Sequence, residues 1–500
     1  MNWIDITIII AYLVGTTLFG CSFFFRKKGD GDGARAFMTG GGTLPTWAIA
    51  LSVFATHVSS ISFLVLPEGA FGPDNWKGWV NSITVPIATL VAAVWFIPFY
   101  RKSTDVSAYS FLERRYGVWA RIYSSMCFLI MQSARSGVIL LLLAILINQL
   151  LGISCETIII VTGVLTMLYA MMGGFAAVVW ADAIQSIILI GGTFVCVGCL
   201  LWFTPDVAAN AKVAWDAGKM SLGSMSLSDW STNTFWVLFL YSICINLQNF
   251  GVDQCYTQRY VAAKSAKAAA RSIFASACIY VPVTLLFTII GTLLWMYNRA
   301  NPGQIPEGIR AAAVFPWFIV NRLPTGVSGL LVAAIIAAAM STIAATLNSG
   351  STVLLEDYWK RFAPQRANER SNLLFLRTMT ILLAVVSIGI ALGVVWCTKD
   401  TTILSSWWAI QGVASGGMLG LFLLSIISRR SNGFAAAVAT VLGLLLIAWI
   451  VFGQGWTGLS FRLHVNLSIV LGTLTLVASG AALSSFFDII RSHGNERTDL

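Results

Sequence analysis

Residues 47–67, WAIALSVFATHVSSISFLVLP, guide the interpretation of the whole chain. Both ends of this stretch are apolar, but its centre, ATHVSS, contains a histidine and three hydroxyl groups. Small polar side chains compete for backbone hydrogen bonds, and unwound backbone at membrane depth is tolerated only where it lines a cavity or is buried in protein. The pattern predicts a broken helix whose freed carbonyl groups can hold a cation, as in secondary transporters. A Ser/Thr-rich face that packs against a neighbouring helix stays open as the alternative.

The composition indicates an all-α integral membrane protein. Of the 500 residues, 57% are hydrophobic and only 10% are charged, whereas soluble domains carry about 25% charged residues. The first apolar run begins at Trp3 without a basic segment before it, which predicts a retained helix and not a signal peptide. The net charge of +10 is assigned to loops at the membrane and not to nucleic-acid binding. The nine cysteines show no paired spacing and predict no metal or disulfide site.

About thirteen stretches are long and apolar enough to cross a bilayer as helices. They lie near residues 3–25, 45–66, 79–100, 120–150, 156–173, 178–204, 232–254, 272–297, 327–357, 373–397, 402–428, 433–453 and 464–489. With the N-terminus outside, 22 of the 31 Lys and Arg residues fall on the cytoplasmic side and 8 outside, and one lies within a span. This bias predicts an external N-terminus and a cytoplasmic C-terminus in the inner (plasma) membrane.

A second span, 232–254, also carries polar residues and a glycine near its middle: Asn246, Gln248, Asn249 and Gly251. Two interrupted spans in corresponding positions indicate an inverted repeat with the binding site between its halves. We predict a single membrane transporter domain over residues 1–500. It would consist of a preceding helix at 3–25, repeats at about 45–204 and 232–428, and extra helices over 433–489.

The span 327–357 places Ala338, Ser341 and Thr342 at helical positions i, i+3 and i+4, and therefore on one face. Two hydroxyls and a carbonyl on that face, opposite the freed carbonyls of the broken helix, would supply about five oxygen ligands for a hard cation. Close packing of small residues between helices is the alternative interpretation.

Arg135 and His57 are ionisable residues inside predicted spans. An arginine at the bilayer centre is a candidate binding residue by default, and its planar fork matches a carboxylate. Arg135 could instead form a structural pair with Asp182 or Asp253. We expect His57 to be a hydrogen-bonding residue in the cavity wall, because no carboxylate shares its span for a proton relay.

Four stretches of the chain resemble the sodium:solute symporter family. They are GGFAAVVWADAIQ at 173–185, QRY at 258–260, the stretch 338–352 ending in LNSGST, and DY at 357–358. Within the family, the stretch from Gly40 to Phe63, with FATxxSSIxF, and the position of Arg135 are most similar to bacterial sodium/sialic acid symporters. This resemblance covers nearly the whole chain. It implies a leucine-transporter-type fold of five plus five inverted helices with flanking helices.

The resemblance also implies roles for individual residues. Sodium, the coupling ion, would be held by the backbone carbonyls of Ala55, Val58 and Ala338 and the hydroxyls of Ser341 and Thr342. Arg135 would bind the carboxylate of the substrate. The other expected substrate-binding residues are His57, Ser59, Ser60, Ser62, Ser82 and Asn246. His57 stands where those transporters tend to have threonine, and Ser82 stands where a glutamine reaches the sugar.

Asp182 corresponds to a residue of a second sodium site in some sialic acid symporters. The serines that accompany it there read Ala344 and Ala345 in this chain. Alanine side chains offer no oxygen, so a hard cation would lack ligands. We therefore expect Asp182 to be a remnant of that site, in a structural role, and expect one sodium per substrate.

These observations predict a sodium-coupled symporter that imports a small organic solute, most similar to transporters of sialic acid or a related acidic sugar, by alternating access. The alternatives are a symporter for a neutral sugar, inositol or another carboxylate, and a transporter-like membrane sensor, against which the lack of a soluble output domain argues. No covalent chemistry is implied, so no enzymatic activity is expected. The expected partners are a small-molecule substrate and the lipid bilayer, without nucleic acid or an obligate protein partner.

Overall fold

The computed structural model describes residues 2–25, 33–102, 105–397, 403–428, 431–453 and 462–495. The regular structure in these ranges is helical, and one isolated bridge joins Leu44 to Ala263. The predicted all-α class is therefore confirmed. Several basic residues of the orientation count lie outside the described residues: Arg26, Lys27, Lys28, Lys399, Arg429, Arg430 and Arg497.

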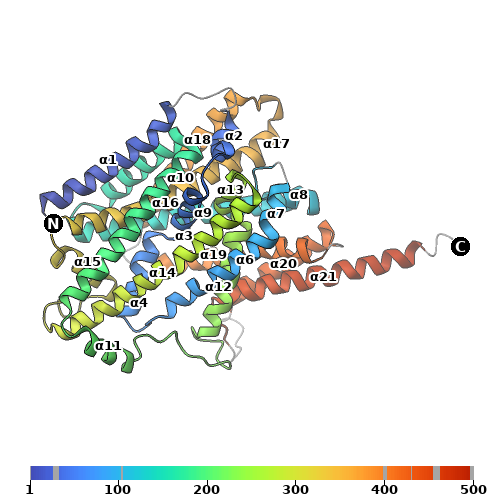
Figure 1. Cartoon of the computed structure of the whole chain (residues 1–500). Helices are drawn as coiled ribbons and strands as arrows, with labels where there is room; N and C mark the ends of the chain where they lie inside the picture. The colour runs from blue at the N-terminus through green and yellow to red at the C-terminus, as the bar shows by residue number, and fades with distance from the viewer. Residues whose placement is uncertain are drawn as a thin grey trace.

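The helices follow one another along the chain with short connections (Figure 1). The α-helices are α1 (Trp3–Phe25), α2 (Ala34–Thr39), α3 (Thr46–His57), α4 (Ser60–Phe71), α5 (Val80–Ile83), α6 (Val85–Val91), α7 (Ile97–Lys102), α8 (Ser110–Tyr116), α9 (Val118–Leu151), α10 (Cys155–Phe203), α11 (Val207–Asp216), α12 (Phe235–Val252), α13 (Gln254–Ala262), α14 (Ala266–Ala300), α15 (Ala311–Asn321), α16 (Val327–Val353), α17 (Lys360–Phe362), α18 (Glu369–Cys397), α19 (Ile403–Ile427), α20 (Gly433–Ala448) and α21 (Leu467–Asn495). Short 3-10 or π turns lie at Gly40–Gly42, Lys77–Trp79, Ala92–Phe96, Leu354–Trp359, Pro364–Arg366 and Trp449–Gly453.

The predicted number of thirteen spans is not confirmed. The described residues contain ten helices that are long and apolar enough to cross a membrane, or eleven if the bent pair α3 and α4 counts as one. Part of the difference is α10, a single element of 49 residues that covers two predicted spans. Its backbone leaves the helical region only at Gly174. The division into two repeats stays a prediction.

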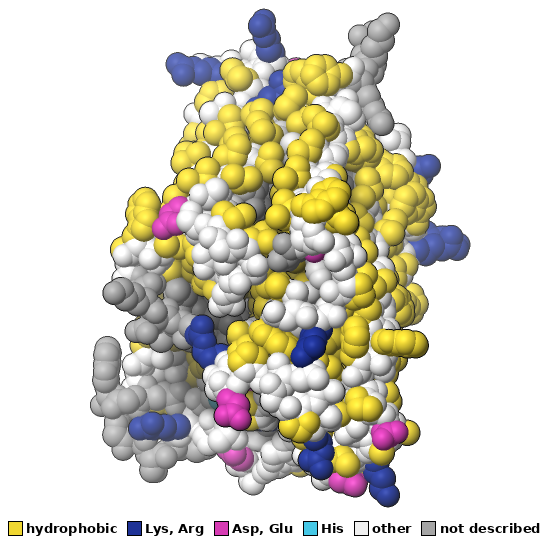
Figure 2. Space-filling model, turned by 90° about the vertical axis from the view of Figure 1, so that its left-hand side faces the viewer, with side chains coloured by type: hydrophobic (Ala, Val, Ile, Leu, Met, Phe, Trp, Pro, Cys, Tyr) yellow, Lys and Arg dark blue, Asp and Glu magenta, His cyan; other side chains and the backbone are white. Residues whose placement is uncertain are grey.

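The helix α16 forms the centre of the molecule. It packs against α1, α9, α10 and α18. In the span that α16 begins, Val327–Phe362, 94% of the most apolar 18-residue segment is buried inside the protein. By contrast, only 22% of the most apolar 18-residue segment is buried in α1, and the same share is buried in α18. Figure 2 shows hydrophobic side chains over much of one outer face, as expected for a surface in contact with lipid. In Figure 1, α1 lies on one flank and α20 and α21 lie on the other.

The predicted break in the first interrupted helix is confirmed. The helix α3 ends at His57, Val58 and Ser59 have extended backbone angles, and α4 starts at Ser60. The two halves are bent by 58°. Small polar residues at this point, which favour non-helical backbone, provide the local reason for unwinding.

The second break lies at a different residue from the one we predicted. Asn246 to Gly251 are helical, and the chain leaves the helix only at Asp253, between α12 and α13. Asp253 is the N-cap of α13, because its carboxylate accepts a hydrogen bond from the N–H of Cys255 at 2.7 Å. The polar residues near the middle of the span misled the prediction, because their amides stay within α12 and the carboxylate of Asp253 caps the start of α13.

Gly174 allows α10 to lie close to Phe37 of α2. Its φ of 59° and ψ of −157° fall in a region that is essentially restricted to glycine. A Cβ atom there would lie 2.9 Å from the carbonyl oxygen of Phe37. We expect Gly174→Ala to destabilise the protein by about 1–3 kcal/mol from backbone strain alone.

Thermal unfolding of the purified protein in detergent would measure this effect. The matched control is Gly191→Ala in the same helix, where an added Cβ meets nothing within 4 Å. We expect the control to unfold at or above the temperature of the unmodified protein. Equal midpoints for the two variants would contradict the role given to Gly174.

Candidate functional site

The break between α3 and α4 faces the hydroxyl groups of α16. The hydroxyl of Ser341 donates to the carbonyl of Ala55 at 3.2 Å and lies 3.0 Å from the carbonyl of Ala338. Thr342 donates to the same Ala338 carbonyl at 3.2 Å. Four of the five predicted sodium ligands are therefore joined by direct contacts, and the i, i+3, i+4 face predicted for α16 is present.

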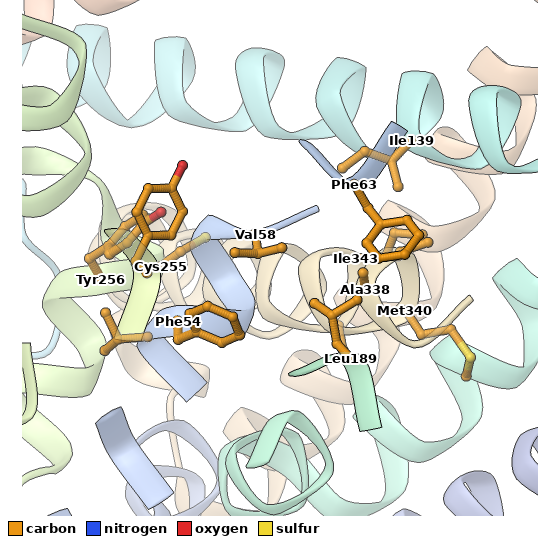
Figure 3. Close-up of a cluster of buried hydrophobic side chains, with 14 of the residues drawn as sticks. Phe54, Val58, Phe63, Ile139, Leu189, Cys255, Tyr256, Ala338, Met340 and Ile343 are labelled. Atoms are coloured by element: carbon orange, nitrogen blue, oxygen red, sulfur yellow. The ribbon is translucent and has the colours of Figure 1, made fainter. Parts of the chain in front are cut away.

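Val58, the fifth predicted ligand, is fully buried in the break. Figure 3 shows Val58 between Ala338 on one side and Cys255 and Tyr256 of α13 on the other. Its backbone is extended, so its carbonyl is outside the regular helical hydrogen bonding of α3. Carbonyl and hydroxyl oxygens are suitable ligands for a hard cation, and the assignment of sodium to these five residues stays a prediction.

Arg135 lies near the middle of α9, and its side chain is half-buried. One guanidinium nitrogen donates to the carbonyl of Thr56, in the last turn of α3, at 3.4 Å. None of the ion pairs found among the described residues includes Arg135, so neither Asp182 nor Asp253 pairs with it directly. The guanidinium fork is thus held at the first break with most of its donors free for an anion.

His57 is part of an aromatic wall beside the break. Its Nδ1 lies 2.7 Å from the hydroxyl of Tyr256. Its ring packs edge-on against Tyr280, with centroids 4.4 Å apart, and lies 5.3 Å from the ring of Phe250. Among the described residues, His57 has no carboxylate as a hydrogen-bond partner. This geometry agrees with a hydrogen-bonding residue in the wall.

Ser59 and Ser60 are buried at the break, and the hydroxyl of Ser60 has no hydrogen-bond partner within the described chain. Ser82 is buried in α5 beside Tyr280. Ser62 is only half-buried, and no contact brings it to Arg135.

Asn246 attaches α12 to α5. Its amide nitrogen donates to the hydroxyl of Thr84 at 2.9 Å and to the carbonyl of Asn81 at 3.1 Å. Its Oδ1 is buried without a partner in the described residues. Because a buried polar atom without a partner is costly, the free oxygens of Asn246 and Ser60 are candidate contacts for a polar ligand or for water.

Asp182 lies in a buried ion pair. Its carboxylate accepts hydrogen bonds from Nη2 of Arg259 at 2.9 Å and from the hydroxyl of Ser52 at 2.6 Å. Arg259, one of the basic residues counted on the cytoplasmic side, has a fully buried side chain. A carboxylate that already has a cationic partner holds α3, α10 and α13 together, in agreement with the structural role expected for Asp182.

Four residues that sequence reasoning did not assign to the site are linked to the surroundings of Arg135. Tyr256 and Tyr280 contact His57, which follows Thr56 in α3. Gln132 is one helical turn before Arg135 on α9 and donates a hydrogen bond to Asp253. The tyrosines lie in segments without a distinctive pattern. Asp253 was considered only as a direct partner of Arg135. Asp253 and Gln254, which shortly precede the QRY motif at 258–260, were a signal in the sequence that could have placed α13 in the site.

The comparisons with known proteins agree with this architecture. The model of the sodium:solute symporter family matches residues 37–443. The chain is 29% identical over 480 residues to the sodium/sialic acid symporter SiaT of Proteus mirabilis (strain HI4320), covering 95% of each protein. It is also 29% identical to the sodium/sialic acid symporter NanT of Aliivibrio fischeri (strain ATCC 700601 / ES114), covering 96% of this chain and 92% of that protein.

Solved structures give the same result for the fold. A substrate-bound, outward-open Na+-coupled sialic acid symporter superposes with a TM-score of 0.89 at 27% identity, covering 97% of this chain and 98% of the other. Mhp1, a nucleobase-cation-symport-1 family transporter in a closed conformation, gives a TM-score of 0.58 at 15% identity, covering 89% and 93% of the two chains, and shares the fold alone.

The leucine-transporter-type fold implied by the sequence is thus confirmed, and the protein is a multi-pass membrane transporter with sodium as its coupling ion. Since the family model matches most of its length, this chain belongs to the sodium:solute symporter family.

Proposed function

We propose that this symporter imports sialic acid or a related acidic sugar together with sodium. The observation that carries the proposal is Arg135, a half-buried arginine at the first helix break without a direct acidic partner in the described chain. A guanidinium in that position suits a bidentate carboxylate. The names of the relatives SiaT and NanT, both sodium/sialic acid symporters, support the same substrate class.

The ligand contacts around Arg135 suit a polyhydroxylated acid. The carboxylate would bind the guanidinium fork. The unpaired oxygens of Ser60 and Asn246 would accept hydrogen bonds from hydroxyl or amide groups, and the rings of His57 and Tyr280 would form an apolar wall. Ser82 stands where the sialic acid symporters have a glutamine that reaches the sugar. The part of this site that would contact the sugar ring therefore differs from theirs.

Coupling follows from the position of the sodium site. Oxygens of Ala55 and Val58 belong to the broken helix, whereas those of Ala338, Ser341 and Thr342 belong to α16. A sodium ion bound to both elements would stabilise the conformation in which they lie together. Because the same break presents Thr56 to Arg135, sodium binding raises substrate affinity by linkage. Alternating access would then exchange the side on which the site opens.

Two further candidates differ from this proposal in measurable ways. A neutral sugar or inositol would not need Arg135, and a transporter-like sensor would bind its ligand without accumulating it. We also propose an inner-membrane location with the N-terminus outside, no enzymatic activity, and no obligate protein partner or nucleic acid. The support for the orientation is the excess of basic residues on the proposed cytoplasmic side.

The orientation predicts which sites a membrane-impermeant thiol reagent reaches. In a background without the native cysteines, Trp215→Cys should be labelled in intact cells, and Ser265→Cys only after permeabilisation. Trp215 is 69% exposed in the loop helix α11, and Ser265 is exposed before α14. The reverse labelling pattern would show that the chain is inserted with the opposite orientation.

Arg135 is predicted to determine the preference for acids. Arg135→Lys keeps the charge but loses the fork, and we expect roughly tenfold weaker sialic acid binding, since hydrogen bonds to charged groups contribute about 1.5–3 kcal/mol. Arg135→Ala should weaken binding by about a hundredfold. Calorimetric binding in the presence of sodium measures both values. The matched control is Arg299→Ala, at an exposed position; tight sialic acid binding by Arg135→Ala would exclude the carboxylate site.

Removal of a sodium-binding hydroxyl should change the sodium requirement and not the fold. We expect Ser341→Ala and Thr342→Ala each to raise the sodium concentration for half-maximal uptake several-fold. The control is Ser351→Ala in the same helix, whose hydroxyl donates only to the Asn348 carbonyl one turn away. If both site variants keep the original sodium dependence, sodium binds elsewhere.

We further expect one sodium per substrate. The Asp182 carboxylate is already paired with Arg259, and Ala344 and Ala345 supply no side-chain oxygen. One sodium with one monovalent acid is electroneutral, so reversal-potential measurements in proteoliposomes should show transport that does not depend on membrane voltage. A two-to-one ratio that Asp182→Ala abolishes would demonstrate a second sodium site at Asp182.

A further inference from the structure

One face of α9 contacts both helix breaks. Arg135 donates to the Thr56 carbonyl at the end of α3. One turn earlier on the same face, the amide nitrogen of Gln132 donates to the carboxylate of Asp253, at the break between α12 and α13, at 2.5 Å. The amide oxygen of Gln132 accepts a hydrogen bond from Thr346 of α16 at 3.4 Å. Gln132 therefore fixes the position of the Asp253 carboxylate relative to Arg135.

Asp253 differs from the other carboxylates that are fully buried in the described chain. Asp182 pairs directly with Arg259 at 2.9 Å, and Asp357 pairs with Arg121 at 2.6 Å. Asp253 is equally buried but forms no direct ion pair among the described residues, and it accepts hydrogen bonds from Gln132 and from the N–H of Cys255.

The titratable side chains around Asp253 come from three segments. Tyr109 precedes α8, Arg135 belongs to α9, and Cys255, Tyr256 and Tyr260 belong to α13. The tyrosines and the cysteine are ordinarily uncharged at neutral pH. Arg135, one turn after Gln132 on α9, is thus the basic side chain of that helix next to the Asp253 contact, although the two charged groups form no direct ion pair.

We propose that Asp253 is the resident counter-ion of Arg135 and sets how tightly the site holds an acidic substrate. This inference rests on the proposed function, in which the substrate carboxylate binds Arg135. When that carboxylate is bound, two anions share one cation in a region of low dielectric constant, where like charges repel strongly. Asp253 therefore weakens the binding of an acid relative to a neutral analogue.

This arrangement suits a transporter, which must release its substrate in every cycle. An arginine without a counter-ion would be costly to bury when the site is empty, and it would hold a carboxylate tightly when the site is full. With Asp253 nearby, the charge of Arg135 is partly balanced in both conditions. Asp253 acts here as a positioning residue, because it would influence the substrate through Arg135 without touching it.

The test is Asp253→Asn, which removes the charge and keeps the cap of α13. An asparagine can still cap α13, since its side-chain oxygen accepts the Cys255 N–H. Its NH2 group then faces Gln132, so the Gln132 amide must turn over, with its oxygen accepting from the asparagine and its nitrogen donating to Thr346. We expect the dissociation constant for sialic acid, measured by calorimetry with saturating sodium, to fall by about tenfold. The constant for the carboxyl methyl ester of sialic acid should not change. A merely structural role would weaken both ligands alike.

A second variant, Asp253→Ser, guards against misfolding of the first. Serine also caps a helix but carries no charge, so it should shift the preference toward the acid in the same direction. Thermal unfolding confirms that each variant is folded. The inference is wrong if folded Asp253→Asn or Asp253→Ser binds the acid no more tightly than the unmodified protein.

The same measurements separate this inference from the proposed function. If Arg135→Ala still binds the acid tightly, the carboxylate site itself is wrong. If Arg135→Ala loses the acid but the Asp253 variants leave the ratio of acid to ester binding unchanged, only the counter-ion role of Asp253 is wrong.

Discussion

The contact between the unwound end of α3 and the hydroxyls of α16 is the constraint on which the site depends. Backbone carbonyls at membrane depth cannot turn to water, so each needs a partner from the protein or a bound ion. The hydroxyl of Ser341 donates a hydrogen bond to the Ala55 carbonyl, and the guanidinium of Arg135 donates one to the Thr56 carbonyl. Because α16 is built largely of small residues, the broken helix can approach it closely enough for these contacts.

Buried ion pairs hold the elements around that contact. The Asp182–Arg259 pair joins α10 to α13, and Ser52 of α3 contacts both charges. In the turn that follows α16, Asp357 pairs with Arg121, which also binds Glu113 of α8. Loss of one member of such a pair leaves a buried charge without compensation, which costs far more than the pair contributes. These pairs therefore fix which helices are neighbours.

The helix α9 connects the two breaks electrostatically. Arg135 and Gln132 lie one turn apart and reach α3 and the α12–α13 junction, respectively. The Thr56 carbonyl at the first break binds Arg135, and the carboxylate of Asp253 at the second break binds Gln132 one turn before it. A ligand that occupies Arg135 changes the charge balance at both breaks, while a sodium ion would act on the first break and α16. In the proposed site, substrate and ion would thus act on the same few elements without sharing ligands.

The sequence alone determined the class of the protein, the first break and the face of α16. Composition and span length identify a helical membrane protein, because lipid requires long apolar helices. The polar centre ATHVSS marks a break, because local side-chain hydrogen bonds compete with the helix. The spacing of Ala338, Ser341 and Thr342 fixes one face through helical geometry alone. The family motifs then indicated which of these features form a site.

Only the tertiary structure decided the partners of the charged residues and the position of the second break. Arg259 resembles a loop residue in sequence, yet it is buried against Asp182, from a helix 77 residues away. Asp253 ends α12 as a helix cap, whereas the amides of Asn246 and Gln248 remain within the helix. Local sequence patterns report local propensity. The pairing of a buried charge depends on which distant helix supplies its counter-ion, and that is known only once the helices are packed.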